Sequence, residues 1–168
     1  LIETVLKLFP NKNEKLIFAD LGTGSGCLII SLLKEYKYST GVGIDINKKA
    51  IKVAERNKNI LSDKQRLKLE LADFSSFKTS EFDVIVCNPP YVNKNQIKNL
   101  QKDVINYEPH QAIFADEEGF IYYKKIIHNL NKNRKCGQKA LFEIGLGQAE
   151  AVCKLLKNND FRLIHIEN

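Results

Sequence analysis

The sequence predicts an α/β fold with a doubly wound, mostly parallel sheet and helices on both of its faces. Short apolar segments alternate along the 168 residues with amphipathic segments of helical periodicity, as in repeated strand–helix units. The expected strands are almost entirely apolar, which is typical of parallel strands covered on both sides. Ligands of such sheets bind beyond the carboxyl ends of the strands. The residues that follow each strand are therefore the candidate site.

Periodicity and turn signals predict the individual elements. Strands are expected at 16–20, 42–46, 66–73, 82–86, 139–145 and 161–166, and helices at about 1–9, 27–37, 48–57, 117–131 and 147–159. A long irregular segment, 88–116, separates the fourth strand from the helix that follows it. A loop of this length within a compact domain is usually functional.

Composition is that of an ordinary globular domain, with 43% hydrophobic and 27% charged residues and no apolar run long enough to span a membrane. The chain contains no Met, so we expect it to be part of a longer protein. The net charge of +6 is spread along the chain and indicates an RNA or ribosomal setting only weakly. The cysteines form no CxxC pair, which argues against zinc, and their apolar surroundings predict reduced core thiols in the cytoplasm. They are Cys27, Cys87, Cys136 and Cys153.

A glycine turn, DLGTGSG at 20–26, follows the first predicted strand and opens a helix. Glycines let a backbone turn tightly and approach a ligand closely. The spacing GxGxG differs from the GxGxxG of dinucleotide sites. The candidate residues are Gly22, Thr23, Gly24, Ser25 and Gly26. A tight strand-to-helix connection without any ligand would explain this motif equally well.

Acidic residues stand at the ends of the next two predicted strands. Asp45 could accept hydrogen bonds from both hydroxyls of a ribose, or could serve with Asn47 to cap the next helix. Asp73 could accept from an adenine amino group, and Phe74 could stack on the adenine ring. Three such signals at successive strand ends predict an adenosine-containing ligand.

With these signals the sequence resembles class I S-adenosylmethionine-dependent methyltransferases, whose first motif is similar to DLGTGSG. The resemblance implies a Rossmann-like fold with S-adenosylmethionine as cofactor and S-adenosylhomocysteine as product. It implies that residues 22–26 border the methionine part and the sugar. By the same resemblance Asp45 binds the ribose, Asp73 and Phe74 bind the adenine, and Asn88 lies beside the methyl group.

Residues 87–91, CNPPY, follow the fourth strand and resemble the NPPY signature of enzymes that methylate adenine N6, guanine N2 or glutamine N5. Such nitrogens are poor nucleophiles because their lone pairs are delocalised. The side-chain carbonyl of Asn88 and the backbone carbonyl of Pro89 can accept hydrogen bonds from the NH2 group and aim it. Pro90 stiffens the turn, and Tyr91 can stack on the flat substrate. Alternatively, the prolines only terminate the strand and Tyr91 belongs to the core.

The order of DLGTGSG, NPPY, YEP (107–109) and EIGLGQ (143–148) resembles the HemK/PrmC family of protein-(glutamine N5) methyltransferases. The resemblance implies a cytoplasmic enzyme of translation termination. Its substrate would be the glutamine of the Gly-Gly-Gln loop in class I peptide-chain release factors. No metal is implied. Glu108, Glu143 and Gln148 are expected to have structural roles, pinning the long loop and capping the next helix.

The chain departs from this family in two ways, because we expect it to lack the family's small N-terminal helical domain and its antiparallel seventh strand. We therefore expect 1–168 to be a single methyltransferase domain and a fragment.

Two other functions remain open. A nucleic-acid amino-methyltransferase would need a basic target-recognition region, whereas the lysines of the long loop are mixed with acids. A non-enzymatic cofactor-binding module would not need an intact NPPY motif.

Overall fold

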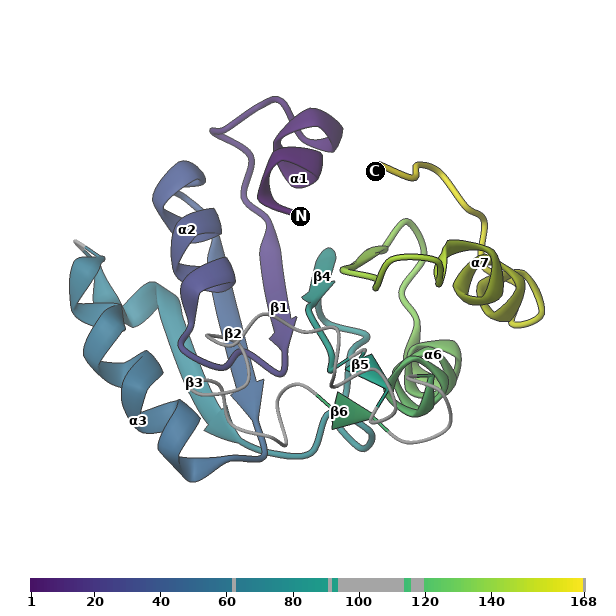
Figure 1. Ribbon diagram of the computed structural model, residues 1–168. Helices are drawn as coiled ribbons and strands as arrows, with labels where there is room; N and C mark the ends of the chain where they lie inside the picture. The colour runs from purple at the N-terminus through teal and green to yellow at the C-terminus, as the bar shows by residue number, and fades with distance from the viewer. Residues whose placement is uncertain (62, 91, 94–113, 116–119, 168) are drawn as a thin grey trace. The chain divides into compact units, whose positions relative to one another are not determined.

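The computed structural model describes residues 1–61, 63–90, 92–93, 114–115 and 120–167 (Figure 1). Two compact units make up the chain, one of Leu1–Asn88 with Asn133–Glu143 and the other of Pro89–Lys132 with Ile144–Asn168. The first unit contains α1 (Ile2–Leu8), β1 (Ile17–Leu21), α2 (Cys27–Glu35), β2 (Thr40–Asp45), α3 (Lys48–Asn57), β3 (Leu67–Leu71), β4 (Val84–Cys87) and β7 (Lys139–Phe142), together with the 3-10 turns η1 (Lys58–Ile60) and η2 (Lys64–Arg66).

The sheet of the first unit has five strands in the order β3-β2-β1-β4-β7, and every neighbouring pair is parallel. The chain builds outward from β1 in one direction through β2 and β3, and then in the other through β4 and β7. The order therefore reverses between β1 and β4, where open α/β sheets bind their ligands. The predicted fold class, a doubly wound parallel sheet with flanking helices, is confirmed.

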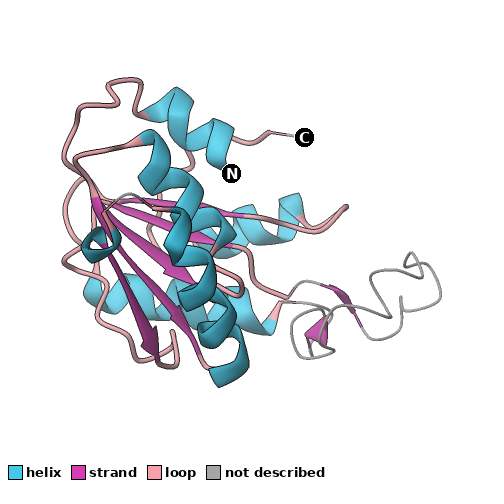
Figure 2. Ribbon diagram, turned by 90° about the vertical axis from the view of Figure 1, so that its left-hand side faces the viewer, coloured by secondary structure: helices cyan, strands magenta, loops and turns pink. Residues whose placement is uncertain are grey.

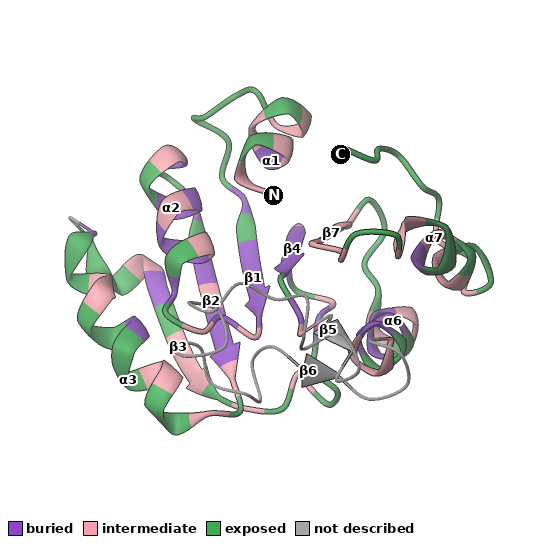
Figure 3. Ribbon diagram, viewed as in Figure 1, coloured by how far each residue is buried: buried purple, intermediate pink, exposed green. Residues whose placement is uncertain are grey.

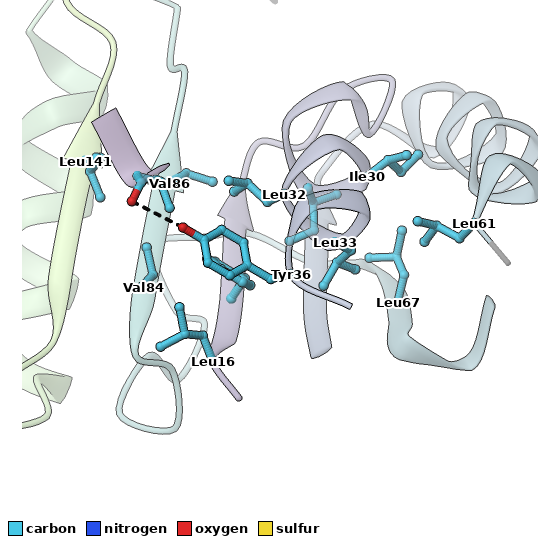
Figure 4. Close-up of a cluster of buried hydrophobic side chains, with 13 residues drawn as sticks. Leu16, Ile30, Leu32, Leu33, Tyr36, Leu61, Leu67, Val84, Val86 and Leu141 are labelled. Carbon is cyan, nitrogen blue, oxygen red and sulfur yellow. Dashed lines mark hydrogen bonds between the residues drawn. The ribbon is translucent and has the colours of Figure 1, made fainter. Parts of the chain in front are cut away.

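Three helices, α1, α2 and α3, pack along one face of this sheet, and Figure 2 shows α2 and α3 lying across the strands. The residues of β1 after Ile17 and all of β4 are buried (Figure 3). Side chains from α2 meet those of β1 and β4 in the core drawn in Figure 4. The hydroxyl of Tyr36 contacts the carbonyl of Val5 at 3.4 Å, the dashed line of Figure 4, and donates a shorter hydrogen bond of 2.7 Å to the carbonyl of Phe9, which anchors the end of α1.

The second unit contains α6 (Ile121–Asn133, all but its last residue), α7 (Ala149–Lys157) and a parallel pair of two-residue strands, β5 (Val92–Asn93) and β6 (Phe114–Ala115). The buried residues of α6 include Tyr123, Ile126, Ile127 and Leu130, which are spaced as one helical stripe. The pair β5–β6 falls within the segment that the sequence predicts as loop. No helix of the described ranges is both long and apolar enough to cross a membrane.

The prediction of a sixth strand at 161–166 is wrong, because residues 161–167 form no strand in the structure. Leu163, Ile164 and Ile166 are exposed by 38%, 54% and 47%. Their pattern favours a strand, but a strand also needs a hydrogen-bonded neighbour, which a local pattern cannot supply.

The prediction that all four cysteines are core thiols is wrong in part. All four are free thiols, but only Cys87 is buried, whereas Cys27 and Cys136 are exposed. Cys153 is half-buried on α7. Cys27 begins α2 and Cys136 lies in a turn, and the sequence alone does not show which residues of such stretches face solvent.

Candidate functional site

The strand register brings most of the predicted site residues to one edge of the sheet. Leu21, the last residue of β1, pairs with Ile44 on β2 and with Cys87 on β4. Asp45 pairs with Leu71 at the end of β3, and Cys87 pairs with Phe142 at the end of β7. Asp45 therefore ends its strand at this carboxyl edge, and the glycine turn, Asp73, Asn88 and Glu143 follow the ends of theirs.

The glycine turn has a left-handed backbone at three places, with φ of +76° at Gly22, +56° at Gly24 and +80° at Gly26. Only glycine adopts such angles without strain. A Cβ added at Gly22 or Gly24 would meet no atom within 4 Å, so the backbone is bare on that side. A Cβ at Gly26 would lie 3.3 Å from the Cβ of Ala54 on α3. The first two glycines thus leave room for a ligand, and the third allows close packing.

Hydrogen bonds hold the turn against β2. The N–H groups of Gly22 and Thr23 both donate to the carbonyl of Ile44, at 2.9 and 2.8 Å. A Cβ at Gly43 would lie 2.8 Å from the hydroxyl oxygen of Thr23, so this glycine of β2 is needed for the turn to settle there. The hydroxyl of Thr23 in turn donates to Asp20 Oδ2 at 2.7 Å.

Asp20 is a fully buried carboxyl on β1, directly beneath the glycine turn. Burial raises the pKa of Asp20 to about 6, the charge of Asp45 adds to the rise, and hydrogen bonding from Thr23 and the Ile29 backbone opposes it. Its Oδ1 atom lacks a hydrogen-bond partner in the described part of the chain. A buried acceptor in this state is suited to an additional polar partner.

Asp45 spans the glycine turn and the start of α3. Its Oδ2 accepts from the N–H of Gly24 at 3.0 Å, and its Oδ1 accepts from the N–H of Asn47 at 2.7 Å. The Asn47 side chain caps α3 by accepting from the N–H of Lys49, as the alternative interpretation expected. Asp45 is half-buried and keeps acceptor capacity for a further donor, because each carboxylate oxygen accepts more than one hydrogen bond.

Asp73 is exposed just beyond β3, and its Oδ1 accepts from the N–H of Ser75 at 2.8 Å. The preceding residue, Ala72, donates its N–H to the carbonyl of Asp45 at 3.1 Å. Asp73 and Asp45 are thus tied to the same part of the edge. Phe74 is half-buried beside Asp73. The assignment of Asp73 and Phe74 to an adenine stays a prediction.

Asn88 is exposed, whereas Pro89 is buried and Pro90 half-buried. The strand before them, β4, extends through Cys87, whose thiol donates to the carbonyl of Leu21 at 2.9 Å. Asn88 therefore emerges next to the start of the glycine turn, at the reversal of strand order. Tyr91, Glu108 and the rest of YEP lie outside the described residues.

Of the two remaining predictions, the capping role of the Glu143 side chain stays a prediction, whereas that of Gln148 can be compared with the structure. Glu143 directly follows β7, and its N–H donates to the carbonyl of Cys87 at 2.9 Å. Gln148 is the N-cap residue of α7, but it makes no side-chain cap. Its Oε1 instead accepts from the N–H of Gly145 at 3.0 Å, so the predicted cap is wrong. This bond directs the Gln148 side chain back to the turn that precedes the helix.

Sequence reasoning missed two residues near the turn. Asp20 begins the motif DLGTGSG but is assigned no role from the sequence. An acid at the end of the apolar stretch LIFAD is unusual, because buried acids are rare, and could have marked it as a functional residue. Asn57 donates from Nδ2 to the carbonyl of Ser25 at 2.9 Å, and no local signal marks it. No group of three or more potential metal ligands occurs among the residues that the structure describes.

Comparison with known proteins identifies the family to which the chain belongs. The family described as "Methyltransferase small domain" matches residues 3–112, which is most of the chain. The chain belongs to this family. A curated relative named "Release factor glutamine methyltransferase", from Thermodesulfovibrio yellowstonii, is 37% identical over 99% of the chain. A second, named "Bifunctional methyltransferase", from Rickettsia typhi, is 39% identical over 88% of the chain. The resemblance to release factor glutamine methyltransferases is thus confirmed.

The chain is shorter than these curated relatives, since it spans 60% of the Thermodesulfovibrio protein and 29% of the Rickettsia protein. Solved structures share its fold. Precorrin-6y C5,15-methyltransferase from Geobacter metallireducens superposes with a TM-score of 0.60 at 13% identity, over 94% of this chain and 71% of that one. An RNA methyltransferase from Salinibacter ruber, in complex with S-adenosyl-L-homocysteine, superposes with a TM-score of 0.58 at 19% identity, over 87% and 77%.

Proposed function

We propose that this chain transfers a methyl group from S-adenosylmethionine to N5, the side-chain amide nitrogen, of a glutamine in class I peptide-chain release factors. The observation that carries the proposal is the position of Asn88, the first residue of the NPPY motif. It directly follows β4, whose last residue, Cys87, pairs with Leu21 at the end of β1, where the glycine turn begins. Relatives with the corresponding name over nearly the whole chain support the choice of substrate.

The residues at the carboxyl edge fit the proposed cofactor. Gly22 and Gly24 leave open space beside their Cα atoms, which allows a ligand to approach the backbone. Asp45 already fixes Gly24 and can accept from ribose hydroxyls as well. The unpartnered Oδ1 of Asp20 adds an acceptor beneath the turn. When bound, the cofactor supplies a methyl group activated by a sulfonium, and S-adenosylhomocysteine is the product.

Asn88 and Pro89 would prepare the substrate amide. Its nitrogen lone pair is delocalised into the carbonyl, so the amide is a poor nucleophile. Two oxygens, the Asn88 side-chain carbonyl and the Pro89 backbone carbonyl, would accept its N–H groups and orient the lone pair. No side-chain base is needed, because the nitrogen becomes acidic as it gains the methyl group and can release its proton to water. Tyr91 would stack on the flat amide.

The wider setting belongs to the same proposal. We place the reaction in the cytoplasm, in the context of translation termination, because all four cysteines are free thiols, as in a reducing compartment. Residues 1–168 would act as one methyltransferase domain, since the family match crosses both compact units. The net charge of +6 suits an encounter with a partner near the ribosome.

Transfer of a labelled methyl group tests the function directly. The protein is incubated with tritiated S-adenosylmethionine and, in separate reactions, with a class I release factor, the same factor carrying Gln→Ala in its Gly-Gly-Gln loop, total RNA and DNA. We expect label on the intact factor alone. Label on RNA or DNA would instead assign the site to adenine or guanine amino groups. If the protein binds S-adenosylmethionine but transfers label to none of the four substrates, it would be a cofactor-binding module without methyltransferase activity.

A further inference from the structure

The glycine turn is held from α3 as well as from β2. The carbonyl oxygen of Ser25, within the turn, accepts a hydrogen bond of 2.9 Å from Nδ2 of Asn57. Asn57 is the last residue of α3 and is half-buried, while Ser25 is exposed. The bond joins the turn to a helix whose first turn is capped next to Asp45. One helix therefore contacts both parts of the proposed cofactor site.

The bond from Asn57 completes the fixing of one peptide unit. The peptide between Ser25 and Gly26 presents a carbonyl, which accepts from Asn57, and an N–H, which donates to the carbonyl of Thr23 at 2.8 Å. Gly26 has a φ of +80°, but glycine adopts negative φ about as readily. The conformational preference of Gly26 therefore does not by itself fix the orientation of this peptide, and a flip would break both hydrogen bonds. Asn57 selects one of the two orientations.

Packing acts in the same place as the hydrogen bond. Ala54 lies one helical turn before Asn57 on the same side of α3 and is fully buried. A Cβ at Gly26 would lie 3.3 Å from the Cβ of Ala54 and 3.1 Å from Cδ1 of Ile30. The Gly26 end of the turn is therefore pressed against α3 and α2, and the Asn57 bond sets the direction of the peptide at that contact.

We propose that Asn57 is a positioning residue that holds the glycine turn in its ligand-ready conformation. A turn with the Ser25–Gly26 peptide flipped must regain the observed orientation before the cofactor binds. The fraction of protein in the flipped state therefore lowers the apparent affinity for the cofactor. The inference rests on the proposed function, because it takes S-adenosylmethionine as the ligand of the turn. It predicts an effect on cofactor binding that exceeds any effect on folding.

Two Asn→Asp variants test the inference. Asn57→Asp keeps the size of the side chain but replaces its donor with a carboxylate that repels the Ser25 carbonyl. Asn59→Asp is the matched control, since Asn59 is exposed in η1 two residues later and undergoes the same change of charge. The affinity for S-adenosylmethionine is measured by isothermal titration calorimetry, and stability by thermal unfolding without ligand. Asn57→Gln, which keeps an amide donor, serves as the rescue variant.

We expect Asn57→Asp to weaken binding about tenfold, as for loss of a preorganising hydrogen bond, with Asn59→Asp equal to wild type and Asn57→Gln in between. If Asn57→Asp binds S-adenosylmethionine as tightly as wild type but melts at a lower temperature, the inference is overturned. The bond from Asn57 to Ser25 would then only stabilise the fold. If Asn57→Asp does not fold, Asn57→Ala, which adds no charge, is judged by the same criteria. Failure of the wild-type protein to bind would overturn the proposed function itself, whereas equal binding by wild type and Asn57→Asp would overturn this inference alone.

Discussion

Asp20 and Asp45 lie close together at the carboxyl edge of the sheet, but their surroundings give them different chemistry. Asp20 is fully buried and accepts a hydrogen bond from the hydroxyl of Thr23. Burial has the larger effect on its pKa, which rises to about 6. Asp45 is half-buried and accepts two backbone N–H groups. The first carboxyl is therefore sensitive to pH near neutrality, and the second is suited to hold hydroxyl donors.

The raised pKa of Asp20 makes folding depend on pH. The folded protein binds this proton more tightly than the unfolded chain, whose carboxyl titrates near its ordinary value of 3.8. The contribution of Asp20 to stability is therefore largest below pH 4, falls as the pH rises to about 6, and is then constant. A shift of about two units corresponds to ~3 kcal/mol.

The Asp20→Asn variant checks this dependence, because an amide does not titrate. The free energy of unfolding is measured by urea denaturation between pH 4 and 7 in both proteins. We expect the difference between variant and wild type to change in favour of the variant by up to ~3 kcal/mol over that range. Parallel curves for the two proteins would show that Asp20 does not titrate as its burial indicates.

Asn88 is exposed, so its replacement should affect chemistry and leave the fold intact. We expect Asn88→Ala to keep its affinity for S-adenosylmethionine and to lose methyl transfer by about 100- to 1,000-fold, as for loss of an acceptor used in the transition state. Single-turnover transfer of tritium, together with calorimetric binding, separates the two effects. Unchanged turnover would rule out the assigned role of Asn88.

Asp45 is the residue assigned to the ribose. We expect Asp45→Ala to weaken S-adenosylmethionine binding by at least tenfold, because it removes a charged acceptor and frees the N–H of Gly24. The control is Asp63→Ala, which removes an exposed acid that caps η2. Calorimetry on both variants decides: equal affinities would show that the ribose binds elsewhere.

At the scale of elements, Arg66 closes the end of α2. Its guanidinium donates to the carbonyls of Leu33 at 2.9 Å, Tyr36 at 3.1 Å and Ser39 at 3.0 Å. The last carbonyls of a helix have no partner within it, and a cation there also complements the helix dipole. Since α2 begins directly after the glycine turn, its stability helps to hold the turn.

We expect Arg66→Leu to lower the free energy of unfolding by about 2 kcal/mol, because it removes the guanidinium donors to the carbonyls of Leu33 and Ser39, whereas the Tyr36 carbonyl still accepts from the N–H of Ser39. Arg66→Lys keeps the charge but loses the planar fork of donors, so it should recover only part of that loss. Urea denaturation of both variants measures the difference. Equal stability of Arg66→Lys and wild type would show that charge alone matters.

At the scale of the whole molecule, the candidate site depends on how the strands are aligned. Asp83 joins three strands at their starts: its Oδ2 accepts from the N–H of Ile17, and its carbonyl accepts from the N–H of Lys139. Its Oδ1 accepts from Nζ of Lys135 at 2.6 Å. This alignment carries through to the opposite edge, where Leu21, Cys87 and Phe142 end in register.

We expect Asp83→Ala to lower the free energy of unfolding by about 1–3 kcal/mol, since the N–H of Ile17 loses its acceptor. Lys135→Ala removes only the partly exposed ion pair and should cost under about 1 kcal/mol. Chemical denaturation of the two variants separates the contributions. A larger loss in Lys135→Ala would show that the ion pair, and not the backbone bond, holds the strands.

The sequence by itself determined the fold class, nearly all elements and the motifs that identify the family. These are local properties: apolar runs predict buried strands, and three glycines in five residues predict a turn between strand and helix. The helix predicted at 48–57 is observed with the same bounds. The glycine turn, Asp45, NPPY and EIGLGQ each follow or end a predicted strand, so the rule that ligands bind at the carboxyl ends of parallel strands already indicates the site, whereas YEP lies within the predicted loop.

Only the tertiary structure decided which residues act together at that edge. The order β3-β2-β1-β4-β7 sets Asn88 beside the glycine turn, and the approach of α3 brings Asn57 to Ser25. Complete burial of Asp20 and the missing strand at 161–166 likewise depend on neighbours distant in sequence. Periodicity reports the environment along one segment, whereas hydrogen-bond partners and burial arise from contacts between segments, which no local pattern encodes.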